Sequence, residues 1–310
     1  MLAVFYNVEN LFDTSDNPRT KDDAFTPDGD LEWNEKKYYQ KLDQLAYVLD
    51  NIGAENIQPA LIGLCEVENY TVVEALANHR RLAPMGYKIV HGDSKDQRGI
   101  DNALIYSENS FKHINHEYIT IDTFAPSPLF SRDILYVKGQ LNDGSILHVF
   151  VNHWPSRRTG PSKTEYKRLA AGQALRAKVD ELEKEDPDIN ILIMGDFNDS
   201  PVNKSVKDAL RAVRVVKEKG DLINLAVAIH EKRKGSVYYN GKWSAFDQFI
   251  VSKSLLKKVS DQKMHLFDDE EVMTKTRKGV SRPKRTFAGH KHLGGFSDHL
   301  AIWLNIDLTN

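Results

Sequence analysis

Short apolar runs rich in β-branched residues recur along the chain and alternate with polar segments. Runs of about four to eight such residues, bounded by turn signals, are typical of buried strands. We therefore expect strands at residues 2–7, 60–65, 88–91, 103–106, 134–141, 146–152, 189–194, 246–251 and 300–306.

Helical periodicity appears between these runs. Residues 35–51 place Leu42, Leu45, Ala46 and Leu49 on one stripe, and residues 164–185 form a longer, mostly polar pattern. Shorter helices are expected at 72–79 and 205–212. Strands that follow strands, with helices at irregular intervals, favour mixed sheets over a strict βαβ repeat. This many strands pack better as two sheets, so the expected fold is α/β, two packed mixed sheets flanked by helices.

Length and composition favour one globular domain. The 310 residues contain neither a repeat of about 20–50 residues nor a low-complexity linker, so we expect a single domain over 1–310. An apolar share of 41% is enough for a core. The single Cys excludes an intramolecular disulfide framework and a Cys-rich zinc site. With 42 Lys+Arg against 44 Asp+Glu, net charge does not steer a polyanion, although a local patch can.

The sequence leaves compartment and partners largely open. No run reaches the roughly 18 apolar residues that a membrane span needs, so no span is expected. No signal peptide precedes the motif that begins at Phe5, which fits a cytoplasmic protein or an exported one whose signal has been removed. The long helices lack a heptad repeat, and no protein partner is predicted.

Two basic stretches are candidates for contact with phosphate. Residues 275–295 form either a solvated surface loop or a phosphate-contacting flap. Residues 157–168 carry a second cluster that could line a groove for a nucleic-acid backbone. The candidate substrate contacts from the two stretches are Arg157, Arg158, Arg282 and Arg285. Tyr238, Tyr239 and Trp243 either stack a base or pack the face of a hairpin.

Acidic, amide and histidine residues lie at the ends of the expected strands. Each alone is explained more simply, as a turn residue, a helix cap or a packed side chain. Together they predict side chains that converge at one edge of a sheet. The residues are Asn7, Glu9, Glu66, His153, Asp196, Asn198, Asp247, Asp298 and His299.

The segments that carry these residues resemble a known family. FYNVENLF, GLCEVEN, NHWPSR, GDFNDSP, FDQFIVS and FSDHLAI are similar, in order, to the motifs of the endonuclease/exonuclease/phosphatase superfamily, the DNase I-like fold. The resemblance extends from Asn7 to His299. It implies a two-sheet α/β sandwich of DNase I-like type with the active site at one edge, and hydrolysis of a phosphoester by an activated water.

The resemblance also implies a divalent metal. Glu66 corresponds to the principal ligand, Asn7 lies beside it, and Asp298 binds or orients the metal through its hydration shell. Hard Mg²⁺ prefers such carboxylate and amide oxygens, and Mn²⁺ is an acceptable substitute. Glu68 is a rival to Glu66, since both lie on the same face of an extended chain.

The remaining motif positions correspond to catalytic groups. Asp196 and Asn198 match the pair that positions the attacking water and the phosphate, and an Asx-turn is the alternative explanation. His299 would contact a non-bridging oxygen while Asp247 holds its imidazole, since a nearby carboxylate favours the imidazolium.

A second histidine pair is implied as well. His153 matches the second catalytic histidine of DNase I-like members, and Asp101 is expected to pair with it.

The substrate is left open by this reasoning, because one fold and one catalytic set serve many phosphoesters. A nuclease is the first hypothesis. A phosphatase or phosphodiesterase acting on a small or lipid-derived ester is the second, and the near-neutral charge favours it. A non-catalytic phosphate-binding module is third, and the intact motifs argue against it.

Overall fold

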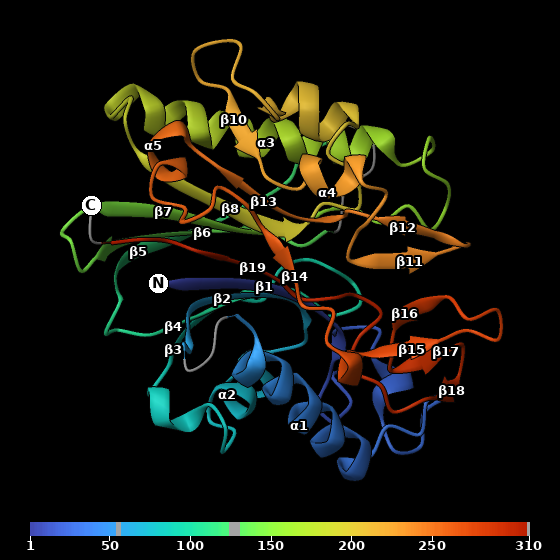
Figure 1. The fold of residues 1–310 in the computed structure, drawn as a ribbon. Helices are drawn as coiled ribbons and strands as arrows, with labels where there is room; N and C mark the ends of the chain where they lie inside the picture. The colour runs from blue at the N-terminus through green and yellow to red at the C-terminus, as the bar shows by residue number, and fades with distance from the viewer. Residues whose placement is uncertain (54–56, 124–130, 309–310) are drawn as a thin grey trace.

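The computed structural model describes residues 1–53, 57–123 and 131–308. Within them, two β-sheets pack face to face, and helices lie on the outer side of each (Figure 1). The predicted fold class, a two-sheet α/β sandwich with mixed sheets, is confirmed. None of the helices in these ranges combines the length and the apolar character that a membrane crossing requires.

The first and last long strands of the chain lie side by side at the centre of the first sheet. Strand β1 pairs in parallel with β2 and antiparallel with the last strand, β19. In spatial order the strands are β14 (His265–Leu266), β19 (Ile302–Asn305), β1 (Leu2–Leu11), β2 (Pro59–Val67), β4 (Asp101–Tyr106) and β3 (Lys88–His91).

The second sheet is built around the parallel pair β7 and β8, to which β13 adds antiparallel. In spatial order the strands are β5 (Phe111–Ile119), β6 (Ile134–Leu141), β7 (Ile146–His153), β8 (Asn190–Asp196), β13 (Asp247–Val251), β10 (Leu222–Asn224) and β9 (Ala212–Val213).

Three small hairpins gather at the end of the sandwich toward which β1 runs from the N-terminus (Figure 1). They are β11 (Val237–Tyr239) with β12 (Lys242–Ser244), β15 (Met273–Lys275) with β16 (Ser281–Pro283), and β17 (Phe287–Ala288) with β18 (Lys291–His292). The hairpin β15–β16 overlaps the start of the basic segment 275–295, and the hairpin β17–β18 lies within it, so that segment is not one irregular loop.

The helices cover the outer faces. The first sheet is covered by α1 (Glu35–Asn51) and α2 (Tyr70–Ala77), and the second chiefly by α3 (Glu165–Glu185) (Figure 1). The side chain of Asn34 accepts the N–H of Lys37 and caps α1, which buries the predicted apolar stripe. The shorter elements are α4 (Val227–Glu231), α5 (Lys253–Leu256), η1 (Asp23–Phe25), η2 (Ala83–Met85), η3 (Ser205–Ala209) and η4 (Glu270–Val272).

Three cores follow from burial of both faces of each sheet. In β1, Ala3 and Phe5 belong to the core between the sheets, while Leu2 and Val4 belong to the core under α1. Because both faces are buried, the central strands read as continuous apolar runs. Alternation along each strand therefore decides which side chains reach the space between the sheets.

Two expectations were wrong. Strand β5 was not predicted, because most of its side chains are exposed or half-buried and its sequence is largely polar, as is tolerated at a sheet edge. The helix expected over 205–212 is a single π-helical turn, η3, after which the chain enters β9.

Candidate active site

The strand ends of the two sheets bring the predicted polar side chains to one edge of the sandwich. In the second sheet His153 and Asp247 both pair with Asp196, on either side of it. In the first sheet Asn7 lies opposite Cys65. Asn7, His153, Asp196 and Asp247 all have the alternation parity of the core between the sheets, so their side chains face the same space.

Glu66 reaches this space through an irregular backbone. Cys65 belongs to the core between the sheets, so regular alternation would direct Glu66 outward. The register of β2 shifts between Cys65 and Val67, and Glu66 has φ = 64°. A non-glycine residue held there costs about 1–3 kcal/mol. Glu66 Oε1 thereby comes to 3.6 Å from His153 Nε2, across the gap between the sheets.

Asp196 and Asn198 form a tight turn at the end of β8. Asp196 Oδ1 accepts the N–H of Asn198 at 2.8 Å, which is the Asx-turn given above as the alternative explanation. Asp196 Oδ2 accepts from Asn7 Nδ2 at 3.1 Å and from Asn198 Nδ2 at 3.3 Å. Phe197, between them, is fully buried on the opposite side. The turn and the orientation of Asp196 into the site therefore coexist.

His299 and Asp247 form the predicted pair. His299 Nδ1 donates to Asp247 Oδ2 at 2.7 Å, and Ser236 Oγ donates to the same oxygen. Val237 forms a β-bridge with His299, which fixes the backbone on which the imidazole stands. His299 Nε2 is left facing Asp196 Oδ2 at 3.9 Å.

The expected pair of Asp101 with His153 does not form. Asp101 accepts the N–H of Ser94 at 2.8 Å and lies with His91 and Asp93 in a cluster of possible metal ligands. Within the described ranges His153 Nδ1 has no hydrogen-bond partner. The reason is parity: Ala103 and Ile105 face the core under α1, and Asp101 shares their side of the sheet.

The two histidines differ in their proton affinity. Burial would lower the pKa of His299, but the carboxylates of Asp247, Asp196 and Asp298 outweigh it and hold that pKa well above 6.5. Burial lowers the pKa of His153 far below 6.5, and the charges of Arg132 and Arg98 lower it further. The site thus presents one imidazolium and one neutral imidazole at neutral pH, an arrangement suited to acid and base roles.

Burial also acts on Asp196. It raises the pKa of this carboxyl group, as do the nearby charges of Asp247 and Glu66, while His299 lowers it. A carboxylate of raised proton affinity is a competent base for a water molecule.

The donor set fits a hard divalent cation. Carboxylate oxygens of Asp196 and Asp247 lie within 4.8 Å of each other. Asp247 Oδ1 is buried and has no hydrogen-bond partner among the described residues. Oxygen-rich donors of net negative charge are what Mg²⁺ prefers. Glu66 and Asn7 flank this cluster, whereas Asp298 Oδ2 is occupied by Arg285 Nη2 at 2.9 Å.

The four candidate arginines have different surroundings. Arg157 Nε donates to the carbonyl of Asn198 at 2.7 Å and its Nη2 pairs with Asp199, so it holds the turn after β8. Arg158 is exposed and borders a cavity. Arg282 lies on β16, half-buried. Arg285 is ion-paired with Asp298 at the edge of the site.

The basic segment 275–295 is anchored to the first sheet. Glu9 Oε2 accepts the N–H of Thr286 at 2.5 Å, and Lys41 Nζ donates to Thr286 Oγ1 at 2.6 Å. Both Glu9 and Lys41 are buried. These contacts hold Arg285 at the site.

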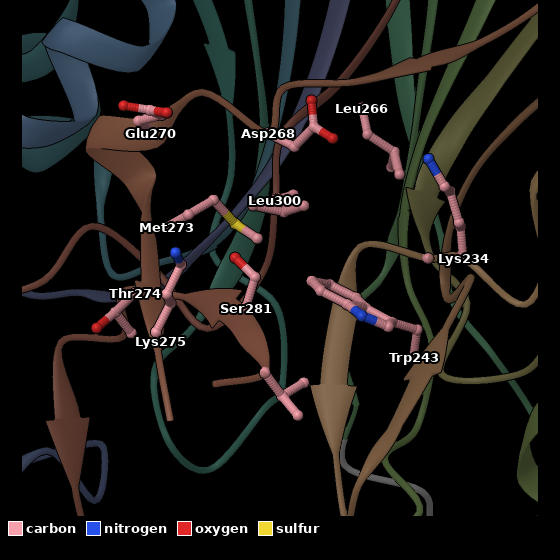
Figure 2. A pocket seen from close by; sticks show the side chains of 12 residues that line it. Lys234, Trp243, Leu266, Asp268, Glu270, Met273, Thr274, Lys275, Ser281 and Leu300 are labelled. Atoms are coloured by element: carbon pink, nitrogen blue, oxygen red, sulfur yellow. The ribbon is translucent and has the colours of Figure 1, made fainter. Parts of the chain in front are cut away.

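A cavity of about 610 Å³ lies beside the candidate site, between the hairpin β11–β12 and the hairpin β15–β16. Figure 2 shows Trp243, Met273 and Leu300 around it, with the charged side chains of Lys234 and Asp268 at its margin. Tyr238 packs edge-on against Trp243, with ring centroids 5.4 Å apart. Trp243 thus packs the face of its hairpin and also lines a cavity, and base stacking by this residue stays a prediction.

Sequence reasoning missed two buried residues that support the site. Ser236 bonds Asp247, and Arg132 donates to the carbonyl of Trp154 at 2.8 Å. Neither lies in a recognisable motif, because each acts through a contact between segments distant in sequence. Glu9 did appear in the first motif, but its role as an anchor for Thr286 became visible only with the fold.

Comparison with known proteins agrees with this geometry. Residues 2–308 match the model of the Endonuclease/Exonuclease/phosphatase family. A comparison with curated protein sequences gives no match.

Solved structures share the fold at low sequence identity. TDP2 from C. elegans superposes with a TM-score of 0.60 and 16% identity, over 98% of this chain and 74% of that one. The human Nocturnin catalytic domain with bound sulfate gives 0.58 and 17%, over 98% and 93%. D. rerio TDP2 in complex with a single-strand DNA product gives 0.53 and 14%, over 98% and 97%.

Proposed function

The chain belongs to the endonuclease/exonuclease/phosphatase family, whose members hydrolyse phosphoester bonds, and we propose that it is a divalent-metal-dependent phosphodiesterase that cleaves nucleic acid. The observation that carries this proposal is the opposition of two histidines, buried His153 and partly buried His299, across Asp196. His153 Nε2 and His299 Nε2 lie 3.7 Å and 3.9 Å from Asp196 Oδ2. A phosphodiester bound among them would contact the imidazolium of His299, the neutral imidazole of His153 and the carboxyl group of Asp196, which can act as a base.

His299 has the role of the cationic group. Its Nε2–H stabilises a non-bridging oxygen as negative charge increases there, and Asp247 and Ser236 fix the orientation of the ring. A preorganised donor of this kind contributes about 10²–10³-fold to the rate.

Asp196 and Asn198 have the role of positioning the nucleophile. Asp196 accepts a proton from the attacking water, in line with its raised pKa. The amide of Asn198 is fixed by the carbonyl of Trp154 at 3.0 Å, and the turn holds it next to Asp196. Neutral His153 accepts a hydrogen bond from the substrate or its water on the other side.

Glu66, Asn7 and Asp298 are the residues we propose to hold Mg²⁺ or Mn²⁺. When bound, the cation supplies Lewis-acid neutralisation of phosphate charge. Arg285 lies beside this ligand set through its bond to Asp298 Oδ2, which supports its assignment as a substrate contact.

Nucleic acid is supported as substrate by two findings. One neighbour of this fold, D. rerio TDP2, binds a single-strand DNA product. The chain also carries basic residues on both sides of the site, Arg158 on one side and Arg285 on the other. A small phosphoester is the second candidate, and the formal charge of −2 favours it, because polyanion binding gains from net positive charge.

A metal-supplemented activity screen tests the proposal. Plasmid DNA, RNA, bis(p-nitrophenyl) phosphate and p-nitrophenyl phosphate are incubated with the protein and Mg²⁺ or Mn²⁺, with and without a chelator. We expect turnover of nucleic acid and of the diester. Turnover of the monoester alone would refute the nuclease assignment.

The site assignment is tested beside it with Asp196→Ala and His299→Ala, and with His265→Ala as a matched control. His265 lies in β14 at the edge of the first sheet and is absent from the cluster of possible metal ligands around Asp196. We expect both site variants to be inactive and the control to retain full turnover. Equal turnover by all three would show that the chemistry happens elsewhere.

A further inference from the structure

A cavity of about 380 Å³ borders the candidate site on the side of His153. Its lining comes from the segment that precedes β4, the residues that precede β6, the loop between β7 and α3, and the first turn of α3. Four cationic side chains contribute to it against one carboxylate. They are Arg98, Arg132, Arg158 and Lys167, and the carboxylate is Asp96.

The cavity shares a backbone group with the candidate site. The carbonyl oxygen of Trp154 accepts from Arg132 Nη2 at 2.8 Å and from Asn198 Nδ2 at 3.0 Å. Pro155 and Ser156, which line the cavity, follow Trp154 and His153 directly in the chain. The charges of Arg132 and Arg98 are near enough to lower the pKa of His153. A molecule bound at Asn198 therefore has the cavity as its immediate neighbour.

Part of the positive charge is built into the protein interior. Arg132 is 5% exposed, and its Nη1 donates to Asp96 Oδ2 at 2.8 Å. Arg98 Nε donates to the other oxygen of Asp96 at 3.3 Å. One carboxylate thus serves two guanidinium groups, and a buried cation that is only half compensated favours an anion close by.

The remaining charge has no acidic partner. Across the described ranges, neither Arg158 nor Lys167 forms an ion pair, and the charged end of Lys167 lies 5.8 Å from the ring of Tyr166. The side chain of Ser131, 6% exposed, lines the cavity and its Oγ has no hydrogen-bond partner in the part of the chain that the structure describes. Donors without acceptors around a cationic hollow are complementary to an oxyanion.

We propose that this cavity, the second-phosphate site, binds a phosphate group of the substrate other than the one that is cleaved. The inference rests on the proposed function, and it deepens it by requiring a substrate with two phosphates in proximity. The second phosphate belongs either to the adjacent nucleotide of a nucleic-acid strand or to a small bisphosphorylated ester. In both cases a phosphate group with one or two negative charges would present its oxygens to Arg158 and Lys167.

Paired substrates that differ by one phosphate provide the test. The first pair is thymidine 3′-(p-nitrophenyl phosphate) with and without a 5′-phosphate. The second compares the dinucleotide TpT with pTpT and TpTp. We expect kcat/KM to be higher for the members with the added phosphate, through KM, by about tenfold for one charge-assisted contact.

The double substitution Arg158→Gln, Lys167→Gln should reduce this preference about tenfold. Lys163→Gln is the matched control, since Lys163 is an exposed lysine between Arg158 and Lys167 in the chain and does not line the cavity. A preference in the dinucleotide series alone assigns the second phosphate to a nucleic-acid strand, and a preference in the first pair alone assigns it to a small ester. No preference in either series, or a preference unchanged in the double variant, refutes the second-phosphate site.

A binding measurement separates this outcome from failure of the proposed function. Fluorescence anisotropy of labelled pTpT, TpTp and TpT is recorded with the metal-free protein, where turnover is not required. We expect the phosphorylated ligands to bind more tightly. The slope of log K against log salt should be shallower in the double variant, by about 0.7 for each phosphate that it no longer neutralises. If no substrate is hydrolysed, the proposed function is wrong, and equal binding of all three ligands would then refute the second-phosphate site separately.

Discussion

The substitution Asp247→Asn isolates the role of the Asp247–His299 pair. The side chain keeps its shape, and an asparagine with its carbonyl oxygen in the place of Oδ2 can still accept from both Ser236 Oγ and His299 Nδ1. The group that faces His299 Nδ1 loses its negative charge, however, and this charge is what favours the imidazolium. We expect the folded structure to persist while the imidazolium loses its charged partner.

The size of the effect follows from the geometry. The two atoms are 2.7 Å apart, and Asp247 is 1% exposed. At an effective dielectric constant of about 20, Coulomb attraction at this distance is about 6 kcal/mol, and the desolvation of both groups offsets part of it. A net loss of about 3–5 kcal/mol corresponds to about 10²–10⁴-fold in kcat, the range of a positioned acid or base.

The assay is kcat for bis(p-nitrophenyl) phosphate with saturating Mg²⁺, recorded from pH 5 to 9 for the parent, Asp247→Asn, His299→Ala and the double variant. Because Asp247 acts through His299, the kcat of the double variant should lie within about fivefold of the kcat of His299→Ala. In Asp247→Asn, activity should fall as pH rises through about 6.5, where an ordinary histidine loses its proton. Additive losses, or an Asp247→Asn protein within tenfold of the parent, would refute the reasoning.

Three further outcomes are expected. Gly139→Ala in β6 should lower the free energy of unfolding by about 1–3 kcal/mol in urea titrations and leave kcat unchanged, because a Cβ there would lie 2.1 Å from Cζ of Phe111; an unchanged midpoint would contradict this. Burial, with the charge of Lys138, lowers the pKa of His148 from 6.5 to about 4. The unfolded chain therefore binds the proton first, and the free energy of unfolding should fall as the pH drops from about 6.5 to 4. His148→Asn should flatten this pH dependence in chemical denaturation, and an unaltered pH dependence would count against the argument. Glu66→Gln should raise the Mg²⁺ concentration for half-maximal activity on the order of 10–100-fold, whereas Glu68→Gln should change it little; the reverse result in a metal titration would make Glu68 the ligand.

Local pattern was sufficient to predict the strands of the sandwich centre. The runs at 60–65 and 146–152 lie within β2 and β7, and the helix at 35–51 coincides with α1. These elements bury one or both faces, so their hydrophobic pattern is dictated by the fold. Edge strand β5 was not predicted, because its exposed polar side chains show no such hydrophobic pattern.

The candidate site residues were predicted from motifs at strand ends, but their mutual arrangement was decided by tertiary structure. Asp101 and Asn102 are neighbours in sequence, yet only Asn102 has the parity of the core between the sheets. Glu66 has the wrong parity and enters the site only because the chain adopts a left-handed conformation at the register shift of β2.

The supporting contacts of Ser236 with Asp247 and of Arg132 with Trp154 join segments 11 and 22 residues apart. Such contacts depend on how two sheets pack and where loops close, and a one-dimensional pattern records neither. A sequence states which faces of its strands are apolar, because burial selects side chains one position at a time. Distances between side chains on different sheets arise only when all of those faces are buried together.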